Sequence, residues 1–209
     1  IRKFVYFLLS CNIGEILIIF SAILLNWDIP LLPIHLLWVN LLTDAFPALA
    51  LGVEKKEPGL MERPPRDPDE PIIDRNMMVN IGVQSVIMTV AVLASFRYGV
   101  RNYGLETGRT YALTTLIVSE LLRAYSARSE SLPLWRLGIF SNRSMNFATL
   151  FSFLLLLVIM LVPAFRGIFQ IELLRLHNWD FVLIMGLMPL IFGELTKVAR
   201  KAFSRLRSE

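Results

Sequence analysis

The sequence predicts an all-α membrane protein, a bundle of six transmembrane helices with a discontinuous second span. Of the 209 residues, 55% are hydrophobic and only 18% are charged, whereas a soluble domain averages about 45–50% apolar and about 25% charged residues. Apolar stretches recur along the chain, each near the roughly 20 residues that cross a bilayer. Pro47 lies inside the second stretch, where it removes a helical hydrogen bond. A single cysteine, Cys11, excludes a disulfide scaffold.

Six stretches approach the length of a membrane span. The fifth is almost purely apolar, while the fourth is the shortest and carries Glu120 and Arg123. Its neighbours support the fourth, because a lone soluble helix inside such a chain would be unusual. The six predicted spans are Phe4–Leu25, Leu31–Leu51, Met77–Tyr98, Tyr111–Tyr125, Phe147–Val162 and Phe181–Val198.

The distribution of basic residues predicts the topology. An even number of spans places both termini on one side, and the segments on that side hold 16 Lys and Arg residues against 5 on the other. The positive-inside rule therefore predicts that both termini of this multi-pass chain are cytoplasmic. These charges are spread over four short segments, so the net charge of +4 indicates topology rather than a nucleic-acid-binding face.

The chain divides into three predicted units. Residues 1–51 form an ion-binding hairpin of two spans, 52–76 a cytoplasmic Pro-rich loop, and 77–209 a four-span C-terminal bundle with a short tail. The segment Val53–Asn76 contains five prolines, seven acidic residues and five basic residues. Prolines fix φ and remove donors, which predicts a braced loop. It is either a simple connector or a docking surface for a cytoplasmic partner domain.

Three carboxylates, Glu15, Asp44 and Glu120, lie within the predicted spans. A charge at the bilayer centre costs at least about 2.5–3.5 kcal/mol on insertion scales, so such a residue indicates function by default. Two of the three also have polar neighbours at helical spacing. Asn12 lies three residues before Glu15. Asn40 lies four residues before Asp44, and a threonine directly precedes Asp44.

The polar residues of the spans predict a site for a hard cation. They offer carboxylate, amide and hydroxyl oxygens, without thiolate or imidazole, and Ca²⁺ takes roughly 6–8 oxygen ligands. Pro47 also leaves the backbone carbonyl of residue 43, beside Asp44, without its helical hydrogen bond. Discontinuous helices of this kind form ion sites in transporters. The alternative is that these residues only join helices by hydrogen bonds. The candidate ligands are Asn12, Glu15, Asn40, Thr43, Asp44 and Glu120.

The remaining polar and aromatic residues have simpler interpretations. His35 and His177 are expected at the membrane interface. Glu194 lies three residues before Lys197, which predicts an ion-paired helix end. Three tryptophans are expected at the non-cytoplasmic boundary, as in an aromatic belt: Trp27, Trp38 and Trp179.

Several motifs together resemble the P-type cation-transporting ATPases, and most closely the calcium pumps of the sarcoplasmic-reticulum type. They are Asn-Ile-Gly-Glu at 12–15, Leu-Leu-Trp-Val-Asn-Leu-Leu-Thr-Asp at 36–44 and Met-Glu-Arg-Pro-Pro-Arg at 61–66. The likeness continues more weakly through Ser119-Glu120 and the last span. It covers essentially the whole chain, as transmembrane helices five to ten of that family.

The resemblance implies a role for each candidate ligand. Asn12 and Glu15 match calcium ligands of the family's fifth helix, and Glu120 matches the ligand of the eighth. The sixth-helix ligands correspond to Asn40, Thr43 and Asp44, with Asp44 bridging two sites. Sodium–potassium pumps carry aspartate at the position of Asn40, so asparagine favours calcium. A pump for Na⁺, H⁺ or Mg²⁺ and, outside this family, a stand-alone channel or secondary transporter are the alternatives.

The resemblance also implies what the chain needs from elsewhere. The family's phosphorylated Asp-Lys-Thr-Gly motif does not occur in the sequence, so ATP and Mg²⁺ are cofactors of the full-length enzyme only, and this chain alone should be inactive. Its implied partners are the N-terminal half of the same pump and the lipid bilayer, without nucleic acid. The implied location is the plasma membrane of a prokaryote or an internal membrane of a eukaryote.

Charge counting predicts proton exchange. The three carboxylates, with one more from the family's fourth helix, would balance two Ca²⁺ ions. After calcium leaves, carboxylates crowded in low dielectric cannot all stay ionised. Proton uptake in exchange for calcium is therefore expected, and it could be measured in sealed vesicles.

Overall fold

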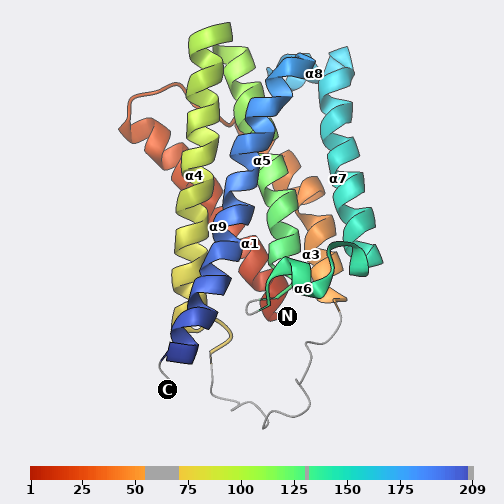
Figure 1. Cartoon of the computed structure of the whole chain (residues 1–209). Coiled ribbons are helices and arrows are strands. Elements are labelled where there is room, and N and C mark those ends of the chain that lie inside the picture. Colours follow the sequence, from red (N-terminus) through yellow and green to blue (C-terminus); the bar gives the residue numbers. More distant parts are fainter. Residues whose placement is uncertain (55–70, 130–131, 207–209) are drawn as a thin grey trace.

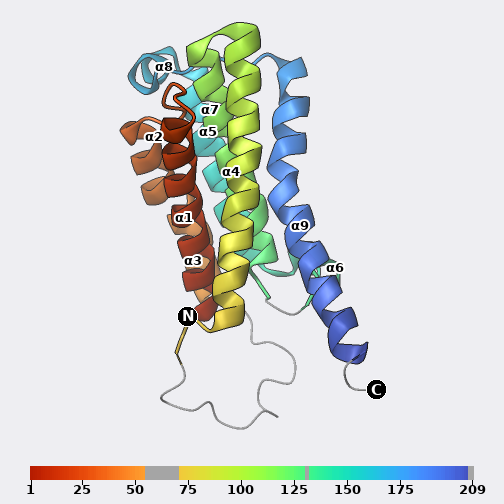
Figure 2. The ribbon, with the colours of Figure 1, turned by 90° about the vertical axis from the view of Figure 1, so that its left-hand side faces the viewer.

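A computed structural model of the chain describes residues 1–54, 71–129 and 132–206, with side chains up to residue 199. Helices dominate these residues and form an elongated bundle, with both chain termini at the same end (Figures 1 and 2). Its six long segments are α1 (Arg2–Leu24), α2 to α3 (Pro33–Gly52), α4 (Arg75–Tyr103), α5 (Leu105–Ser126), α7 (Arg143–Leu161) and α9 (Trp179–Leu206). Short helices connect them: α6 (Leu134–Leu137), η3 (Ile139–Ser141), α8 (Pro163–Phe169) and η4 (Leu176–Asn178). The predicted all-α membrane bundle is confirmed.

Among the described residues, five helical segments are long and apolar enough to cross a membrane. The fourth predicted span, Tyr111–Tyr125, corresponds to α5, which has 22 residues but is not among these five. This agrees with its being the shortest predicted span and the one that carries Glu120 and Arg123. It packs against α4, α7 and α9 and is buried over most of its length. A helix surrounded by protein needs fewer apolar side chains than one that faces lipid. The threonines and serines of α5 accordingly face other helices.

Small residues let the central helices approach closely. A Cβ atom added at Gly99 of α4 would lie 2.7 Å from the Cα atom of Gly108 in α5, which is closer than real side chains pack. Gly186 of α9 lies against the Val118 side chain of α5 in the same way. Close backbone contact of this kind is how helices gain packing energy where lipid supplies little hydrophobic driving force.

The second span is discontinuous, as predicted. It runs through α2 (Pro33–Trp38), a π-helical segment η1 (Val39–Thr43) and α3 (Ala45–Gly52), with Asp44 between the last two. Pro47 cannot donate a backbone hydrogen bond to the carbonyl of Thr43, and the Ser152 hydroxyl of α7 donates to that carbonyl instead, at 2.9 Å. The irregular backbone therefore lies where protein, rather than lipid, satisfies it.

His35, expected at the membrane interface, is enclosed by protein near the start of the second span. Its side chain is fully buried at the end of the bundle opposite the termini. Nδ1 accepts a hydrogen bond from the Leu32 N–H at 3.1 Å, which leaves Nε2 to donate to the Phe169 carbonyl at 2.6 Å. The rings of His35 and Phe169 are also stacked, with their centroids 6.0 Å apart. The histidine thus joins the start of the second span to α8.

Candidate functional site

Three buried carboxylates from three helices lie at the centre of the bundle. Glu15 on α1 is 5% exposed, Asp44 at the break in the second span 0%, and Glu120 on α5 1%. Five of their six oxygens have no hydrogen-bond partner among the described residues. Unpaired buried carboxylates are among the costliest groups a protein can hold. Such an arrangement has the charge and the free oxygens that suit a positively charged ligand.

Glu15 and Asn40 contact one another directly. The Asn40 amide donates to Oε2 of Glu15 at 2.6 Å and to the Leu36 carbonyl at 3.0 Å. This contact joins the first span to the second at the level of the π-helical segment. It also orients the Asn40 amide, since both donated hydrogen bonds come from Nδ2.

The other two candidate ligands bond within their own helices. The Asn12 amide donates to the Leu8 carbonyl at 2.8 Å, and the Thr43 hydroxyl donates to the Val39 carbonyl at 2.9 Å. Both keep an oxygen that can accept or coordinate. The structure thus brings Asp44 and Glu120 together and pairs Glu15 with Asn40, whereas Asn12 and Thr43 have no hydrogen bond to a carboxylate.

A thiol belongs to the cluster, contrary to the oxygen-only set expected from the sequence. The Cys11 sulfur and one oxygen each of Asp44 and Glu120 lie within 4.8 Å of one another, and all three side chains are buried. Cys11 is four residues before Glu15, so both lie on one face of α1. That spacing in the sequence was the signal that could have identified Cys11 as a neighbour of the predicted ligands.

Arg123 is the second residue that the sequence interpretation missed. Its side chain is 1% exposed, and neither Nη atom has a hydrogen-bond partner among the described residues. The guanidinium carbon lies 5.3 Å from the centre of the Tyr6 ring, and its charge interacts with those of Asp44 and Glu120. One positive charge thus accompanies three carboxylates. The signal was its position three residues after Glu120, on the same face of α5.

Glu194 is a buried carboxylate whose two oxygens both accept hydrogen bonds from protein groups. Its oxygens accept hydrogen bonds from the Ser126 hydroxyl at 2.6 Å, from the Leu134 N–H at 2.7 Å and from the Lys197 ammonium at 2.7 Å. The predicted ion pair with Lys197 is confirmed. Both carboxylate oxygens of Glu194 therefore have partners within the protein, whereas five oxygens of the central cluster have none among the described residues.

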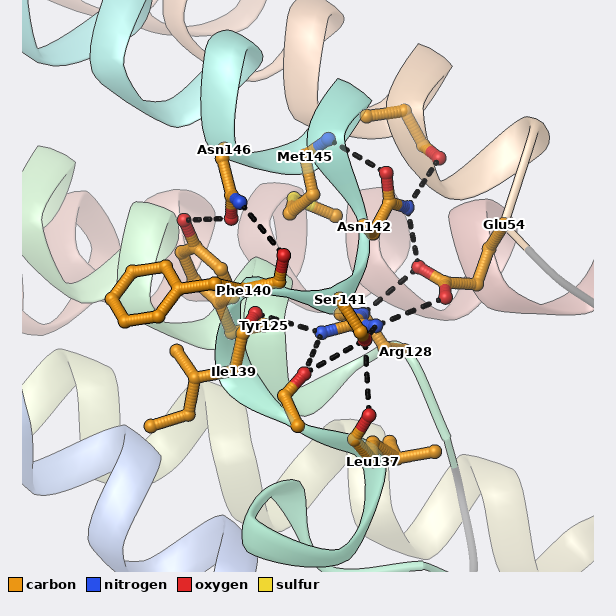
Figure 3. A network of polar contacts seen from close by, with 12 residues as sticks. Glu54, Tyr125, Arg128, Leu137, Ile139, Phe140, Ser141, Asn142, Met145 and Asn146 are labelled. Carbon is orange, nitrogen blue, oxygen red and sulfur yellow. Dashed lines mark hydrogen bonds and ion pairs between the residues drawn. The ribbon is translucent and has the colours of Figure 1, made fainter.

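A second satisfied network lies at the end of the bundle that carries the termini (Figure 3). Arg128 forms two hydrogen bonds to Glu54, at 2.9 and 3.2 Å, and Asn142 donates to the same carboxylate at 2.6 Å. Arg128 also donates to the carbonyls of Gly138 and Ile139. Burial raises the pKa of Glu54, but the hydrogen bonds from Arg128 and Asn142 outweigh it, and the pKa lies below its ordinary value.

This network and one surface ion pair hold both ends of the Pro-rich loop. Glu54, near the start of the loop, is the last residue described before 55–70, and Asp74 near the end of the loop accepts a hydrogen bond from Arg2 at 2.6 Å. Asp74 also caps α4 by accepting from the Met77 N–H at 2.7 Å. The motif at 61–66 lies outside the described residues.

Comparison with known proteins identifies relatives across most of the chain. Residues 28–199 match the family described as cation transporting ATPase, C-terminus. The chain is 35% identical over 218 residues to calcium-transporting ATPase 1 of Bacillus cereus, covering 96% of this chain and 24% of the relative. It is 36% identical to the calcium-transporting ATPase of Bacillus subtilis, covering 93% and 22%. With mouse calcium-transporting ATPase type 2C member 2 the identity is 31%, covering 99% and 22%. The chain therefore spans about a quarter of the length of these relatives.

Proposed function

The chain belongs to the cation-transporting ATPases, as part of their C-terminal region, and from this premise we propose that it supplies the transmembrane ion site of an ATP-driven calcium pump. The observation that carries the proposal is the cluster of three buried carboxylates with five unpartnered oxygens. Several relatives are named calcium-transporting ATPases. In this proposal Ca²⁺ is the cargo, and ATP and Mg²⁺ act on the rest of the whole protein.

The proposed ligands provide the oxygen chemistry that a hard cation requires. Glu15, Asp44 and Glu120 supply the charge. The amide and hydroxyl oxygens of Asn12, Asn40 and Thr43 complete the set of candidates. Asn40 has a double role, because its amide nitrogen holds the Glu15 carboxylate while its oxygen stays available. The Cys11 thiol lies beside these oxygens as a neutral neighbour that suits a hard cation less well.

Arg123 changes the charge balance that the carboxylates alone imply. With its guanidinium included, the three carboxylates carry a net charge of −2 rather than −3, which one divalent cation neutralises. We propose that Arg123 offsets one carboxylate permanently. When the cation leaves, the remaining negative charge calls for protons, so proton movement opposite to calcium remains part of the proposal.

The three units predicted from the sequence take roles in this proposal. Residues 1–51 and α5 hold the ion, while residues 77–209 otherwise support the hairpin from the side. The loop 52–76 would receive the phosphorylation domain of the whole pump on the cytoplasmic side. Of its two described anchors, Glu54 binds Arg128, just after α5, and Asn142, at the start of α7, while Asp74 caps α4.

Ion transport by the whole protein tests the proposal. We expect Asp44→Asn and Glu120→Gln to lower the apparent calcium affinity of ATP-dependent uptake into sealed vesicles by about 10–100-fold, the range for loss of a group that supports a metal site. Glu106→Gln is the matched control, since Glu106 is an exposed residue in the first turn of the same helix as Glu120. Unchanged calcium affinity in both cluster variants would contradict the proposal.

Two further measurements separate calcium from other cargoes. ATP hydrolysis stimulated by Ca²⁺, but not by Na⁺ or by Mg²⁺ beyond that needed for ATP, supports a calcium pump. Asn40→Asp adds a carboxylate beside Glu15, and we expect it to weaken the preference for calcium over monovalent ions. Stimulation of the parent protein by Na⁺ alone would assign the site to that ion instead.

A further inference from the structure

A stripe of side chains along the outer face of α4 is apolar over most of its length and basic at its end. Four valines in this stripe are between 40% and 57% exposed, although they belong to the central bundle. Successive members of the stripe are three or four residues apart, which places them on one face of the helix. Its members are Val79, Val83, Val86, Val90, Ala94, Arg97 and Arg101. The stripe is thus apolar along most of the span and basic over its last two turns.

The basic end of the stripe opens into a hollow of about 600 Å³. Most of its lining comes from the last turns of α4, which lie at the end of the bundle opposite the chain termini (Figure 2). Trp27, just after α1, and Phe181, at the start of α9, form its sides. Arg97, Arg101 and Asn102 contribute the polar part of the lining. The hollow is therefore aromatic at its sides and positively charged.

The positive charge in this hollow has no acidic partner in the part of the chain that the structure describes. The guanidinium of Arg97 lies 5.1 Å from the centre of the Trp27 ring, and its buried Nε atom has no hydrogen-bond partner there. Arg101 is exposed. Arg109, at the same end of the bundle, differs because it donates to the Ile29 carbonyl and to Gln170. Arg97 and Arg101 are left to bind something else.

We propose that this hollow binds an anionic phospholipid, with the phosphate between Arg97 and Arg101 and an acyl chain along the valines of α4. Guanidinium groups match phosphate oxygens in pairs, and a tryptophan at the side suits the headgroup region of a bilayer. Two guanidinium charges exceed the single charge of a phosphodiester. The surplus favours a headgroup without an amine, such as that of phosphatidylglycerol, over phosphatidylcholine.

The apolar part of the stripe favours a lipid over a soluble phosphate compound as the ligand of this hollow. A soluble phosphate would use the two arginines and leave the exposed valines without a partner. A phospholipid can contact both parts of the stripe. Its charged headgroup is joined directly to its acyl chains, just as the basic part of the stripe directly follows the apolar part. The proposal depends on the membrane location of the chain and not on the identity of the transported ion.

Native mass spectrometry of the whole protein tests lipid selectivity. With equal phosphatidylglycerol and phosphatidylcholine of matched chains, we expect retention of the anionic lipid to be about tenfold greater, and the variant Arg97→Gln/Arg101→Gln to lose that preference. The control Arg136→Gln/Arg175→Gln removes equal charge from exposed positions outside the hollow. Equal retention of both lipids, or a preference that the Arg97→Gln/Arg101→Gln variant keeps, would overturn the proposal.

Fluorescence locates the bound lipid. Brominated phosphatidylglycerol should quench Trp27 at least severalfold more than brominated phosphatidylcholine, measured as the difference between the protein and its Trp27→Phe variant. Arg97→Lys/Arg101→Lys keeps the charge but loses the paired geometry, so it should show intermediate selectivity while remaining folded. Glycerol 3-phosphate provides the soluble comparison. If it displaces the brominated lipid at similar concentration, the site recognises free phosphate and the lipid proposal is wrong.

Discussion

At the scale of single residues, the chain contains two kinds of buried carboxylate. Glu54 and Glu194 are surrounded by protein donors, whereas Asp44 and Glu120 have unpartnered oxygens. The first kind is structural, since its charge is neutralised and hydrogen-bonded within the fold. The second kind leaves charge for a ligand. Burial alone does not separate the two, and only the positions of neighbouring donors do so.

Removing the charge of Arg123 should strengthen cation binding. A positive charge beside Asp44 and Glu120 repels an incoming cation, and a pair interaction near effective dielectric 20 is worth a few kcal/mol at short range. We expect Arg123→Gln to raise apparent calcium affinity by about tenfold, and Arg123→Lys to leave it near the original value. The measurement is calcium-dependent ATP hydrolysis by the whole protein. Equal loss of affinity in both variants would show that Arg123 has only a packing role.

Glu54 should make stability depend on pH. Its pKa is lower in the folded state than in the unfolded chain, so its stabilisation is complete above the unfolded value of about 4.3 and is lost as pH falls through the folded value. We expect Glu54→Gln to lower the melting temperature of the whole protein at pH 7 by roughly 2–4 °C per kcal/mol lost. The difference from the original protein should shrink below about pH 4. An equally large difference at pH 7 and pH 3 would contradict this assignment, and Glu106→Gln provides an exposed control.

At the scale of helices, two features place the site. The break in the second span puts Asp44 between a π-helical turn and α3, and the Ser152 hydroxyl completes the backbone hydrogen bonding there. The packing of α5 against α4, α7 and α9 buries Glu120, and one of its oxygens lies within 4.8 Å of an Asp44 oxygen. A transport cycle that moves the second span has a loosened backbone available at Asp44.

Glycine contact between α4 and α5 yields a prediction about packing. A Cβ atom at Gly108 would overlap Val100 and the backbone of α4, so Gly108→Ala should destabilise the protein by about 1–3 kcal/mol, the usual cost of overpacking. Gly82→Ala on α4 meets no atom within 4 Å and should be neutral or slightly stabilising. Thermal unfolding of both variants in the same detergent checks the difference. Similar melting temperatures for the two would indicate that the helices separate without cost.

At the scale of the whole molecule, the chain carries the proposed ion site and corresponds to only part of its relatives. It spans about a quarter of its calcium-transporting relatives, and no Asp-Lys-Thr-Gly motif occurs in its sequence. Both termini lie at one end of the bundle (Figures 1 and 2), as an even number of spans requires. That this end is cytoplasmic remains a prediction from the positive-inside rule.

The isolated 209-residue chain should therefore not hydrolyse ATP. We expect no phosphate release above background with ATP, Mg²⁺ and Ca²⁺, while the whole protein shows calcium-dependent release. A whole protein with its phosphorylated aspartate replaced by asparagine is the control for contaminating hydrolases. Calcium-dependent hydrolysis by the isolated chain would contradict the assignment of energy conversion to other parts of the pump.

The sequence by itself determined the spans, the break near Pro47 and the three acidic positions. Each follows from local chemistry, because bilayer thickness sets helix length and carboxylates in a span are conspicuous. Only the tertiary structure decided which of these residues meet. It placed Cys11 and Arg123 within the cluster, paired Glu15 with Asn40 and buried His35. Those contacts join residues from different helices, and their distances depend on how the helices rotate and approach, which spacing along one helix does not encode.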